Sequence, residues 1–413
     1  MIAGFVNPHN PRRLGAKAVT GVCWMGAWRR HFLASDGMAT TNSEVQIVGG
    51  DYRAKLGESP VWINGELVFI DVVAKEICTL RDGTVRRAQL PKMPGSIVPS
   101  SKGGFLAALA VDADGSGGQL RRVVLRYDDT GTLEADTSEE FFCNVLDAQV
   151  HRPLADKPEE RQCLNDGKCD ARGRVWVGSK VLGRPDMDAR YVQAGPDTPT
   201  GSNRNDESAH ASSAHFSPSE DAPPAGALFC VEPAFSYRNG SMVKVGVAGT
   251  VAEVGGVWTS NGIAWSPRGD TMYYADSPRR RVEAYDFDAE SGLLRNGRVF
   301  ARMPDDVGVP DGMCVDEGGG VWVCVWDAGK VVRYVPDGEG NAKLDRTIAF
   351  PCSRPTSCCF GGANGTTLFV TSCSLDTTVD ADAKDMSVDE PTAGGVFAID
   401  VGVKGVPVHA AAF

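Results

Sequence analysis

The sequence predicts an all-β protein and, within that class, a six-bladed β-propeller. Three observations support this prediction. A β-hairpin pattern recurs six times along the 413 residues, two clear copies are spaced as propeller blades are, and helical periodicity is convincing nowhere. A chain of this length also exceeds the roughly 150 residues that are typical of a single core, which favours a modular ring.

The repeated hairpin defines the predicted blades. Its six copies start at Gly57, Ser96, Asn165, Ser260, Pro310 and Thr356. In the three clearest copies, NDGKCDARGRVWVG, SNGIAWSPRGDTMYYAD and PDGMCVDEGGGVWVCVW, a polar residue precedes glycine and a turn leads into a β-rich run with tryptophan or tyrosine. Asn261 and Asp311 are about 50 residues apart, the length of a four-stranded blade. Six hairpins of one kind predict six sheets around one axis.

Further strands and two inserts complete the predicted propeller, which we expect over residues 44–413. Third strands are predicted within 281–292 and 330–340, and fourth strands within 297–304 and 344–351. Polar inserts interrupt the pattern at about 184–225 and 374–392. The first insert is rich in proline, serine, aspartate and alanine and buries too little apolar surface to offset its ordering entropy, so we expect a mobile loop.

Residues 1–43 differ from the rest in composition. They contain no acidic residue before Asp36, and their basic residues are Arg12, Arg13, Lys17, Arg29 and Arg30. Organelle transit peptides share this bias. A disordered extension upstream of a second start at Met38 explains it equally well, and the sequence leaves both interpretations open.

The overall composition argues against nucleic-acid and membrane partners. The formal net charge is −11, and no stripe of lysine and arginine alternates with aromatic residues. No apolar run approaches the roughly 18 to 20 residues that span a bilayer. The twelve cysteines include no C-x-x-C pair, so most are expected to be reduced and buried. We therefore expect a cytoplasmic protein, and no protein partner is evident from the sequence.

Four oxygen-bearing side chains recur near the starts of the predicted inner strands: Glu58, Asn165, Asn261 and Asp311. A propeller brings such positions together on its axis. Carboxylate and amide oxygens suit Ca²⁺, Mg²⁺ or Mn²⁺, whereas Zn²⁺ prefers nitrogen or sulfur. Taken singly, each residue also fits ordinary turn chemistry, but turns do not favour glutamate. Of the histidines only His151 lies in the middle of the predicted fold, which disfavours a Ser-His-Asp or Cys-His hydrolase.

Several motifs together resemble one known family. The motifs are LGESPVW at 56–62, NDGKCDARGR at 165–174, SNGIAWS at 260–266, PDGMCVDEGGGVWV at 310–323 and TSCCFGG at 356–362. In this order they are similar to the family of regucalcin (senescence marker protein), gluconolactonase and luciferin-regenerating enzyme. The resemblance covers the chain from about residue 45 to its end, apart from the two inserts.

This resemblance implies a six-bladed propeller that holds one divalent cation and hydrolyses lactones or related esters. Ca²⁺ is the expected occupant, with Zn²⁺, Mn²⁺ and Mg²⁺ as alternatives. By motif, Glu58, Asn261 and Asp311 would be the metal ligands, and Asn165 would face the substrate or a metal-bound water. Asp311 would also be the catalytic base that takes a proton from the attacking water.

Two departures from the family pattern affect the expected substrate. Cys163 stands where sugar-lactone members carry an arginine, which leaves Arg161 as the nearest arginine for substrate binding, and Gly183 stands near an expected glutamate. The resulting prediction is a metal-dependent lactonase of gluconolactonase type with a small-molecule lactone as its partner. Two alternatives stay open: a non-catalytic calcium-binding regulator, and a hydrolase of another ester, such as an aromatic lactone or an organophosphate.

Overall fold

The computed structural model describes residues 44–111, 117–137, 141–145, 162–181, 228–231, 245–247, 257, 259–303, 308–338, 341–375 and 389–412. The chain divides into two units, 1–40 and 41–413, and all described residues belong to the second unit. The predicted leader at 1–43, the insert at 184–225 and most of the insert at 374–392 therefore lie outside the described residues.

Six antiparallel sheets form the described part of the chain, and the predicted all-β class is confirmed. Blade 1 contains β2 (Gly57–Ile63), β3 (Glu66–Asp71), β4 (Glu76–Arg81) and β5 (Thr84–Gln89). Blade 2 contains β6 (Pro94–Pro99), β7 (Phe105–Leu109), β8 (Gln119–Tyr127) and β10 (Phe141–Asn144), with β9 (Leu133–Asp136) paired to β8. Blade 3 contains β11 (Gln162–Cys169), β12 (Val175–Val181), β13 (Leu228–Val231) and β14 (Val245–Val247).

The remaining three sheets follow the same plan. Blade 4 contains β15 (Ser260–Trp265), β16 (Thr271–Asp276), β17 (Arg281–Phe287) and β18 (Leu294–Arg302), with the 3₁₀ turn η3 (Ser277–Arg279) after β16. Blade 5 contains β19 (Val309–Val315), β20 (Val321–Trp326), β21 (Lys330–Pro336) and β22 (Ala342–Ala349). Blade 6 contains β23 (Pro355–Gly361), β24 (Thr367–Ser372), β25 (Val396–Asp400) and β1 (Gln46–Val48).

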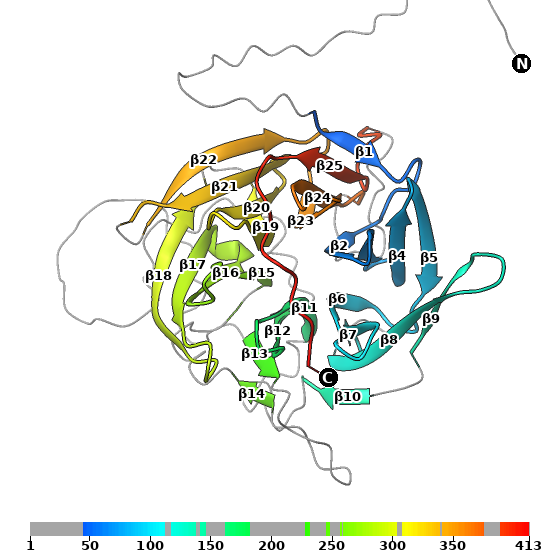
Figure 1. Cartoon of the computed structure of the whole chain (residues 1–413), viewed down its shortest axis with the longest axis horizontal. Coiled ribbons are helices and arrows are strands. Elements are labelled where there is room, and N and C mark those ends of the chain that lie inside the picture. Colours follow the sequence, from blue (N-terminus) through cyan, green and yellow to red (C-terminus); the bar gives the residue numbers. More distant parts are fainter. Residues whose placement is uncertain are drawn as a thin grey trace, which may run out of the picture. The chain divides into compact units, whose positions relative to one another are not determined.

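The first strands of the six blades line the axis of a closed ring (Figure 1). Each first strand contacts the first strand of the next blade, and β2 contacts both β6 and β23, which completes the circle. The six hairpins predicted from the sequence are the first and second strands of the six blades, so the six-bladed propeller is confirmed. The predicted third and fourth strands correspond to β17, β18, β21 and β22.

A short N-terminal strand closes the ring. Ile47 of β1 pairs with Phe397 of β25, so the start of the propeller forms the outer edge of its last blade. Sheet hydrogen bonds therefore join the two ends of the circle. Three residues carry too little pattern for the sequence to predict this pairing.

The C-terminal segment crosses the ring at one end of its axis, and the two ends of the axis are called its mouths. After β25, the Val406 amide donates to the Val315 carbonyl at 3.1 Å, and the Ala411 amide donates to the Pro99 carbonyl at 2.7 Å. These carbonyls belong to blades 5 and 2, at the ends of the first strands, and Figure 1 shows the segment, in red, passing across the ring. Residues that begin the first strands therefore lie at the opposite mouth.

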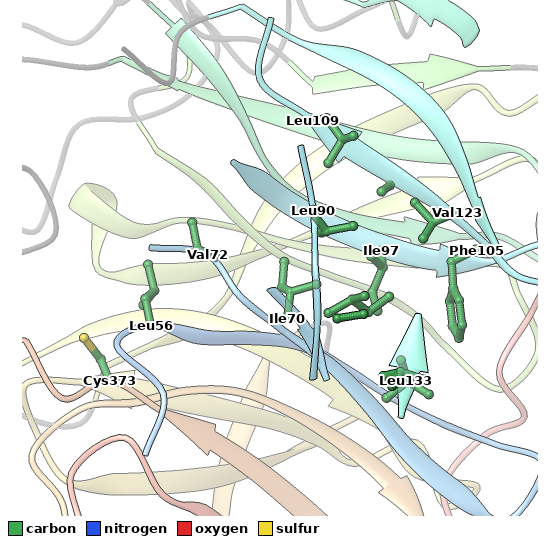
Figure 2. Close-up of a cluster of buried hydrophobic side chains, with 14 of the residues drawn as sticks. Leu56, Ile70, Val72, Leu90, Ile97, Phe105, Leu109, Val123, Leu133 and Cys373 are labelled. Carbon is green, nitrogen blue, oxygen red and sulfur yellow. The ribbon is translucent and has the colours of Figure 1, made fainter. Parts of the chain in front are cut away.

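Apolar side chains from adjacent blades form the core. Figure 2 shows one such cluster, in which Ile70 of blade 1 and Ile97, Phe105 and Val123 of blade 2 pack together. Strands buried on both faces explain the runs of apolar residues in the sequence, and their burial provides the main stabilising free energy. The ten cysteines whose side chains are described are all buried, and none of them forms a disulfide bond. Among the described residues, no helix has the length and apolar character that crossing a membrane requires.

Buried aspartates hold the first turn of two blades. In blade 5, Asp316 accepts hydrogen bonds from Trp322 Nε1 and Arg333 Nε, both at 2.7 Å, and from two backbone amides of its own turn. In blade 3, Asp170 pairs with Arg174 at 2.6 Å in the same way. The carboxylate satisfies the turn amides and fixes the next strand, so these acids are structural.

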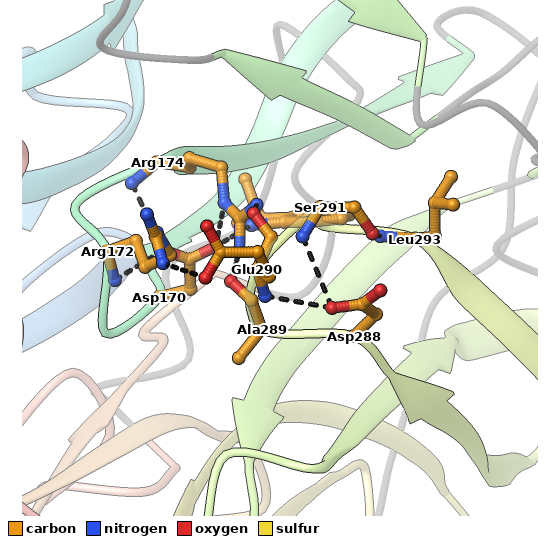
Figure 3. A network of polar contacts seen from close by, with 9 residues as sticks. Asp170, Arg172, Arg174, Asp288, Ala289, Glu290, Ser291 and Leu293 are labelled. Atoms are coloured by element: carbon orange, nitrogen blue, oxygen red, sulfur yellow. Dashed lines mark hydrogen bonds and ion pairs between the residues drawn. The ribbon is translucent and has the colours of Figure 1, made fainter.

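The blade 3 turn is also tied to blade 4 (Figure 3). The Arg174 guanidinium donates to the Ala289 carbonyl at 2.8 Å, and Arg172 pairs with Glu290 at 2.6 Å. Asp288 accepts the Glu290 amide at 2.9 Å and so orders the loop that receives the arginines. These contacts lie at the ends of the first strands and help to fix the angle between the two blades.

Candidate functional site

Every first strand of the propeller carries a β-bulge at the same level. In each of the six blades, one extra residue interrupts the pairing of the first strand with the second. The irregularities lie between Glu58 and Val61, Pro94 and Ser96, Leu164 and Gly167, Ser260 and Ile263, Pro310 and Met313, and Pro355 and Cys358. Bulges bend a strand and redirect its side chains, and they are frequent near functional sites.

The predicted site residues lie at these bulges. Asn165, Asn261 and Asp311 are within the extra-residue segments of blades 3, 4 and 5, and Glu58 borders the segment of blade 1. The strand irregularity therefore explains why polar side chains appear at these positions in otherwise apolar strands. The ring then places the four bulges at one level around the axis.

The glycines that follow Asn261 and Asp311 allow neighbouring first strands to touch. A β-carbon on Gly262 would lie 2.6 Å from the Asp311 carbonyl oxygen, and one on Gly312 would lie 2.7 Å from Ser357 Cα. No ordinary side chain fits there. In the Asn-Gly and Asp-Gly pairs of the sequence, the two residues therefore have different roles. The glycine is required by the close packing of the strands, and the polar residue lies at the axis.

Hydrogen bonds connect two of the predicted residues, Asn165 and Asn261, across blades and extend to the residue before Asp311. Asn165 Nδ2 lies 2.7 Å from the Ser260 carbonyl and 3.4 Å from Asn261 Oδ1. Asn261 Nδ2 donates to Ser277 Oγ at 2.7 Å, and Ser277 Oγ donates to the Pro310 carbonyl at 2.7 Å. This chain of contacts runs from β11 through β15 and η3 to β19, directly before Asp311. It fixes the orientation of the Asn261 amide.

Acidic side chains that are withdrawn from water gather near the axis of the ring. Glu58 is 8% exposed and Asp311 is 5% exposed. Burial raises the pKa of Glu58 well above its usual range, and the carboxylates of Asp311 and Asp166 raise it further. The pKa of Asp311 is likewise raised well above its usual range, first by burial and then by Asp166. Such a group of acids is stabilised by a bound cation.

Two lysines and a third acid of this site were not predicted from the sequence. Asp166 follows Asn165 in the blade 3 bulge, and burial raises its pKa to about 6 against the opposing effect of Lys168 and Lys180. Lys168 Nζ donates to the Met313 carbonyl at 2.7 Å and thereby joins β11 to β19. Asp166 could have been noticed in the NDG motif, whereas no sequence pattern marks Lys180.

The arrangement suits a cation that prefers oxygen. Glu58 and Asp311 supply carboxylates and Asn261 supplies an amide oxygen, a donor set typical of Ca²⁺ and similar ions. Within the described part of the chain, no three His, Cys, Asp or Glu side chains gather in a way that could hold a metal. A cation here would therefore use the amide as well as the two carboxylates. Arg161, predicted to bind substrate, lies outside the described residues.

Comparison with known proteins agrees with the motifs. Residues 56–374 match the model of the SMP-30/Gluconolactonase/LRE-like region. The chain is 29% identical to regucalcin of Gallus gallus over 370 residues, which cover 89% of this chain and 97% of that protein. It is 28% identical to regucalcin of Xenopus laevis over 358 residues, 85% of this chain and 93% of the relative.

Two solved structures share the fold. A luciferin-regenerating enzyme superposes with a TM-score of 0.61 at 23% identity, covering 90% of this chain and all of that chain. A regucalcin from Agrobacterium tumefaciens, described as a calcium-binding protein, superposes with a TM-score of 0.57 at 22% identity and covers 89% of this chain and 98% of its own. At these identities the likeness shows the architecture.

Proposed function

The chain belongs to the SMP-30/gluconolactonase/LRE-like family, and from this premise we propose that it is a divalent-metal-dependent hydrolase that opens lactones. In this proposal Glu58, Asn261 and Asp311 hold the cation, for which Ca²⁺ is the first candidate. Asn165 faces the substrate or a water molecule. The substrate enters at the mouth opposite the C-terminal segment, where the first strands begin.

The buried carboxylates of Glu58 and Asp311 carry this proposal. They come from blades 1 and 5, more than 200 residues apart in sequence, and both are less than a tenth exposed. No ion pair within the described residues involves either carboxylate; Glu58 accepts only the amide of Ser59, at 3.1 Å. Burying two repelling acids reduces the stability of the fold, so their presence favours a bound ion.

The residues of the site suit ester hydrolysis. When bound, a divalent cation polarises the lactone carbonyl and stabilises the negative charge that develops on its oxygen. Asp311 accepts a proton from the attacking water, because its carboxylate lies at the axis beside the proposed cation and burial raises its pKa, which makes it a better proton acceptor. Asn261, held by Ser277, keeps the site in place, and Asn165 offers a carboxamide to the ring of the substrate.

A calcium-binding role without catalysis is the second candidate. It is favoured by the similarity to regucalcins, one of which is described as a calcium-binding protein. The same three ligands would serve in that case. Hydrolysis of another ester, such as an aromatic lactone or an organophosphate, would use the same metal site with a different substrate-binding surface. The two positions on which the expected substrate depends, Arg161 and Gly183, lie outside the described residues.

One assay separates these functions. Protein freed of metal with a chelator is reloaded with Ca²⁺, Mn²⁺, Mg²⁺ or Zn²⁺ and tested on a panel of aliphatic, sugar and aromatic lactones, with an aryl ester and an organophosphate alongside. Metal-dependent ring opening supports the lactonase. Calcium binding in calorimetry without turnover of any compound supports the regulator, and turnover confined to the aryl ester or organophosphate supports the third function.

A further inference from the structure

Lys180 lies between the strands that carry two of the proposed site residues, Asn165 and Asn261. It lies near the end of β12, paired with Cys163 of β11 on one side. On the other side it forms an isolated bridge with Thr259, directly before β15. Asn165 follows Cys163 by two residues, and Asn261 follows Thr259 by two. Lys180 therefore lies between the two strand segments that carry these asparagines.

The ammonium of Lys180 is close to the axis. It interacts electrostatically with the carboxylates of Glu58, Asp166 and Asp311, which come from β2, β11 and β19. These are the first strands of blades 1, 3 and 5, alternate blades of the ring. These three strands are arranged around the axis of the ring, so the ammonium lies on the axial side of β12. Lys180 is half-buried, so its charge is partly withdrawn from water as well.

The Lys180 side chain has no evident structural role among the described residues. Within the described residues, no ion pair or hydrogen bond occupies its ammonium, in contrast to Lys168, which is bound to the Met313 carbonyl. A half-buried ammonium that only neutralised the acids would gain most by direct contact with one of them. Once a divalent cation is held by Glu58 and Asp311, those two acids are balanced. The third acid, Asp166, has Lys168 as its stronger opposing charge, so Lys180 is left to interact with a ligand.

We infer that Lys180 binds an anionic substituent of the substrate, so that the preferred substrates are lactones that carry a carboxylate beside the ring. The inference rests on the proposed function and specifies its substrate class. In this arrangement Lys180 binds the carboxylate of the substrate while the proposed cation binds the carbonyl of its ring. The two contacts together orient one small molecule in the site. Charged hydrogen bonds in partly buried sites contribute more than neutral ones, so the preference should be clear.

The test compares three lactones that share one ring: an unsubstituted five-membered lactone, the same ring with a carboxylate, and the methyl ester of that carboxylate. Ring opening is followed by NMR with wild type, Lys180→Met and Lys180→Arg. Lys102→Met is the control, since Lys102 is exposed at the turn of blade 2. We expect Lys180→Met to lower kcat/KM for the carboxylated lactone about tenfold and to leave the other two unchanged, and Lys180→Arg to retain most of the activity.

An equal decrease of kcat/KM for all three lactones in Lys180→Met would overturn the inference, because Lys180 would then act on the lactone ring or on the fold. An unchanged kcat/KM for all three lactones in this variant would also overturn it. If wild type opens none of the lactones with any metal, the proposed function fails separately. Binding of the ring-opened hydroxy dicarboxylate to calcium-loaded protein then decides about Lys180: affinity about tenfold weaker in Lys180→Met supports the subsite, and equal affinity or no binding to wild type contradicts it.

Discussion

Gly312 of blade 5 packs directly against Ser357 of blade 6, so closely that a β-carbon on the glycine would lie 2.7 Å from Ser357 Cα. Real β-carbons do not approach other atoms this closely. The two first strands can therefore be neighbours only because the residue after Asp311 has no side chain. The packing of the ring and the position of a proposed metal ligand depend on the same dipeptide.

Gly312→Ala should lower the free energy of unfolding by about 1 to 3 kcal/mol, the usual effect of overpacking a well-filled interior. Urea unfolding measures the change. Adding Ser357→Gly removes the Oγ and Cβ atoms that the new methyl group would meet, so the double variant should recover part of the loss. A single variant as stable as wild type would show that the two strands do not approach one another in this way.

Asp311→Ala should abolish metal binding and lactone turnover while leaving the fold intact. The substitution removes a charged ligand from a small ligand set, and it removes no core side chain. Calorimetry with Ca²⁺ and circular dichroism report the two properties separately. Glu317→Gln is a suitable control, since this exposed acid lies at the opposite mouth. Calcium binding as tight as in wild type would exclude Asp311 as a ligand.

The metal-free protein should become less stable as the pH rises above about 4. In the folded state the pKa values of Glu58 and Asp311 are raised, so the folded protein retains protons that the unfolded chain releases. The stability from these protons is complete below the unfolded pKa values and is lost as the pH increases toward the folded ones. Calcium should therefore raise the Tm more at pH 8 than at pH 5, because the ligands must be deprotonated.

Glu58→Gln tests this origin of the pH dependence. Removing one buried carboxylate should raise the Tm of the metal-free protein at pH 8 by on the order of 2 °C, and it should abolish most of the increase caused by calcium. Thermal unfolding with and without chelator, in wild type and in the variant, gives both values. A metal-free Glu58→Gln protein that melts below wild type would mean that the Glu58 carboxylate is already compensated in the fold.

Asp316→Ala should cost about 3 kcal/mol or more of stability, because it leaves Arg333 and the Trp322 indole without their buried partner. The Asp316 side chain is fully buried. Asp286→Ala breaks an exposed pair with Arg298 and should change stability by no more than about 0.5 kcal/mol. Chemical denaturation of the two variants compares them directly, and equal effects would argue against a structural role for Asp316.

Glucono-1,5-lactone should be a poor substrate relative to less hydroxylated or aromatic lactones, by a factor on the order of ten. By the family resemblance, a hydroxyl-binding arginine is expected at position 163, and this chain has Cys163 there, whose side chain is buried. A side-by-side measurement of kcat/KM decides this. Strong preference for the sugar lactone that persists in Arg161→Ala would show that other residues bind the hydroxyls.

Much of the fold could be predicted because its signals are local. The alternation of apolar residues in VWVCVW and the glycines between paired runs specify strands and turns within a few residues of each other. The site candidates could be named for the same reason, since Asn261 and Asp311 stand in repeated motifs. Their roles as ligands stay predictions, and so does the part assigned to Arg161.

Contacts between residues far apart in the sequence could not be predicted from local patterns. The pairing of Ile47 with Phe397 joins residues 350 positions apart in a strand of three residues, and the crossing of the C-terminal segment depends on carbonyls from blades 2 and 5. Nothing in the sequence near Lys180 indicates that three acids from alternate blades interact with it electrostatically. Such contacts are determined by the closure of the ring.

By itself, the sequence determined the class of fold, the number of blades and the residue types at the axis, because alternation, turn glycines and polar residues before glycine are properties of short segments. The tertiary structure alone decided which of these residues face one another, how deeply Glu58 and Asp311 are buried, and that Lys180 joins them. The physical reason is that burial and electrostatic interaction depend on distances in space, and only the closed ring brings strands hundreds of residues apart to a common axis.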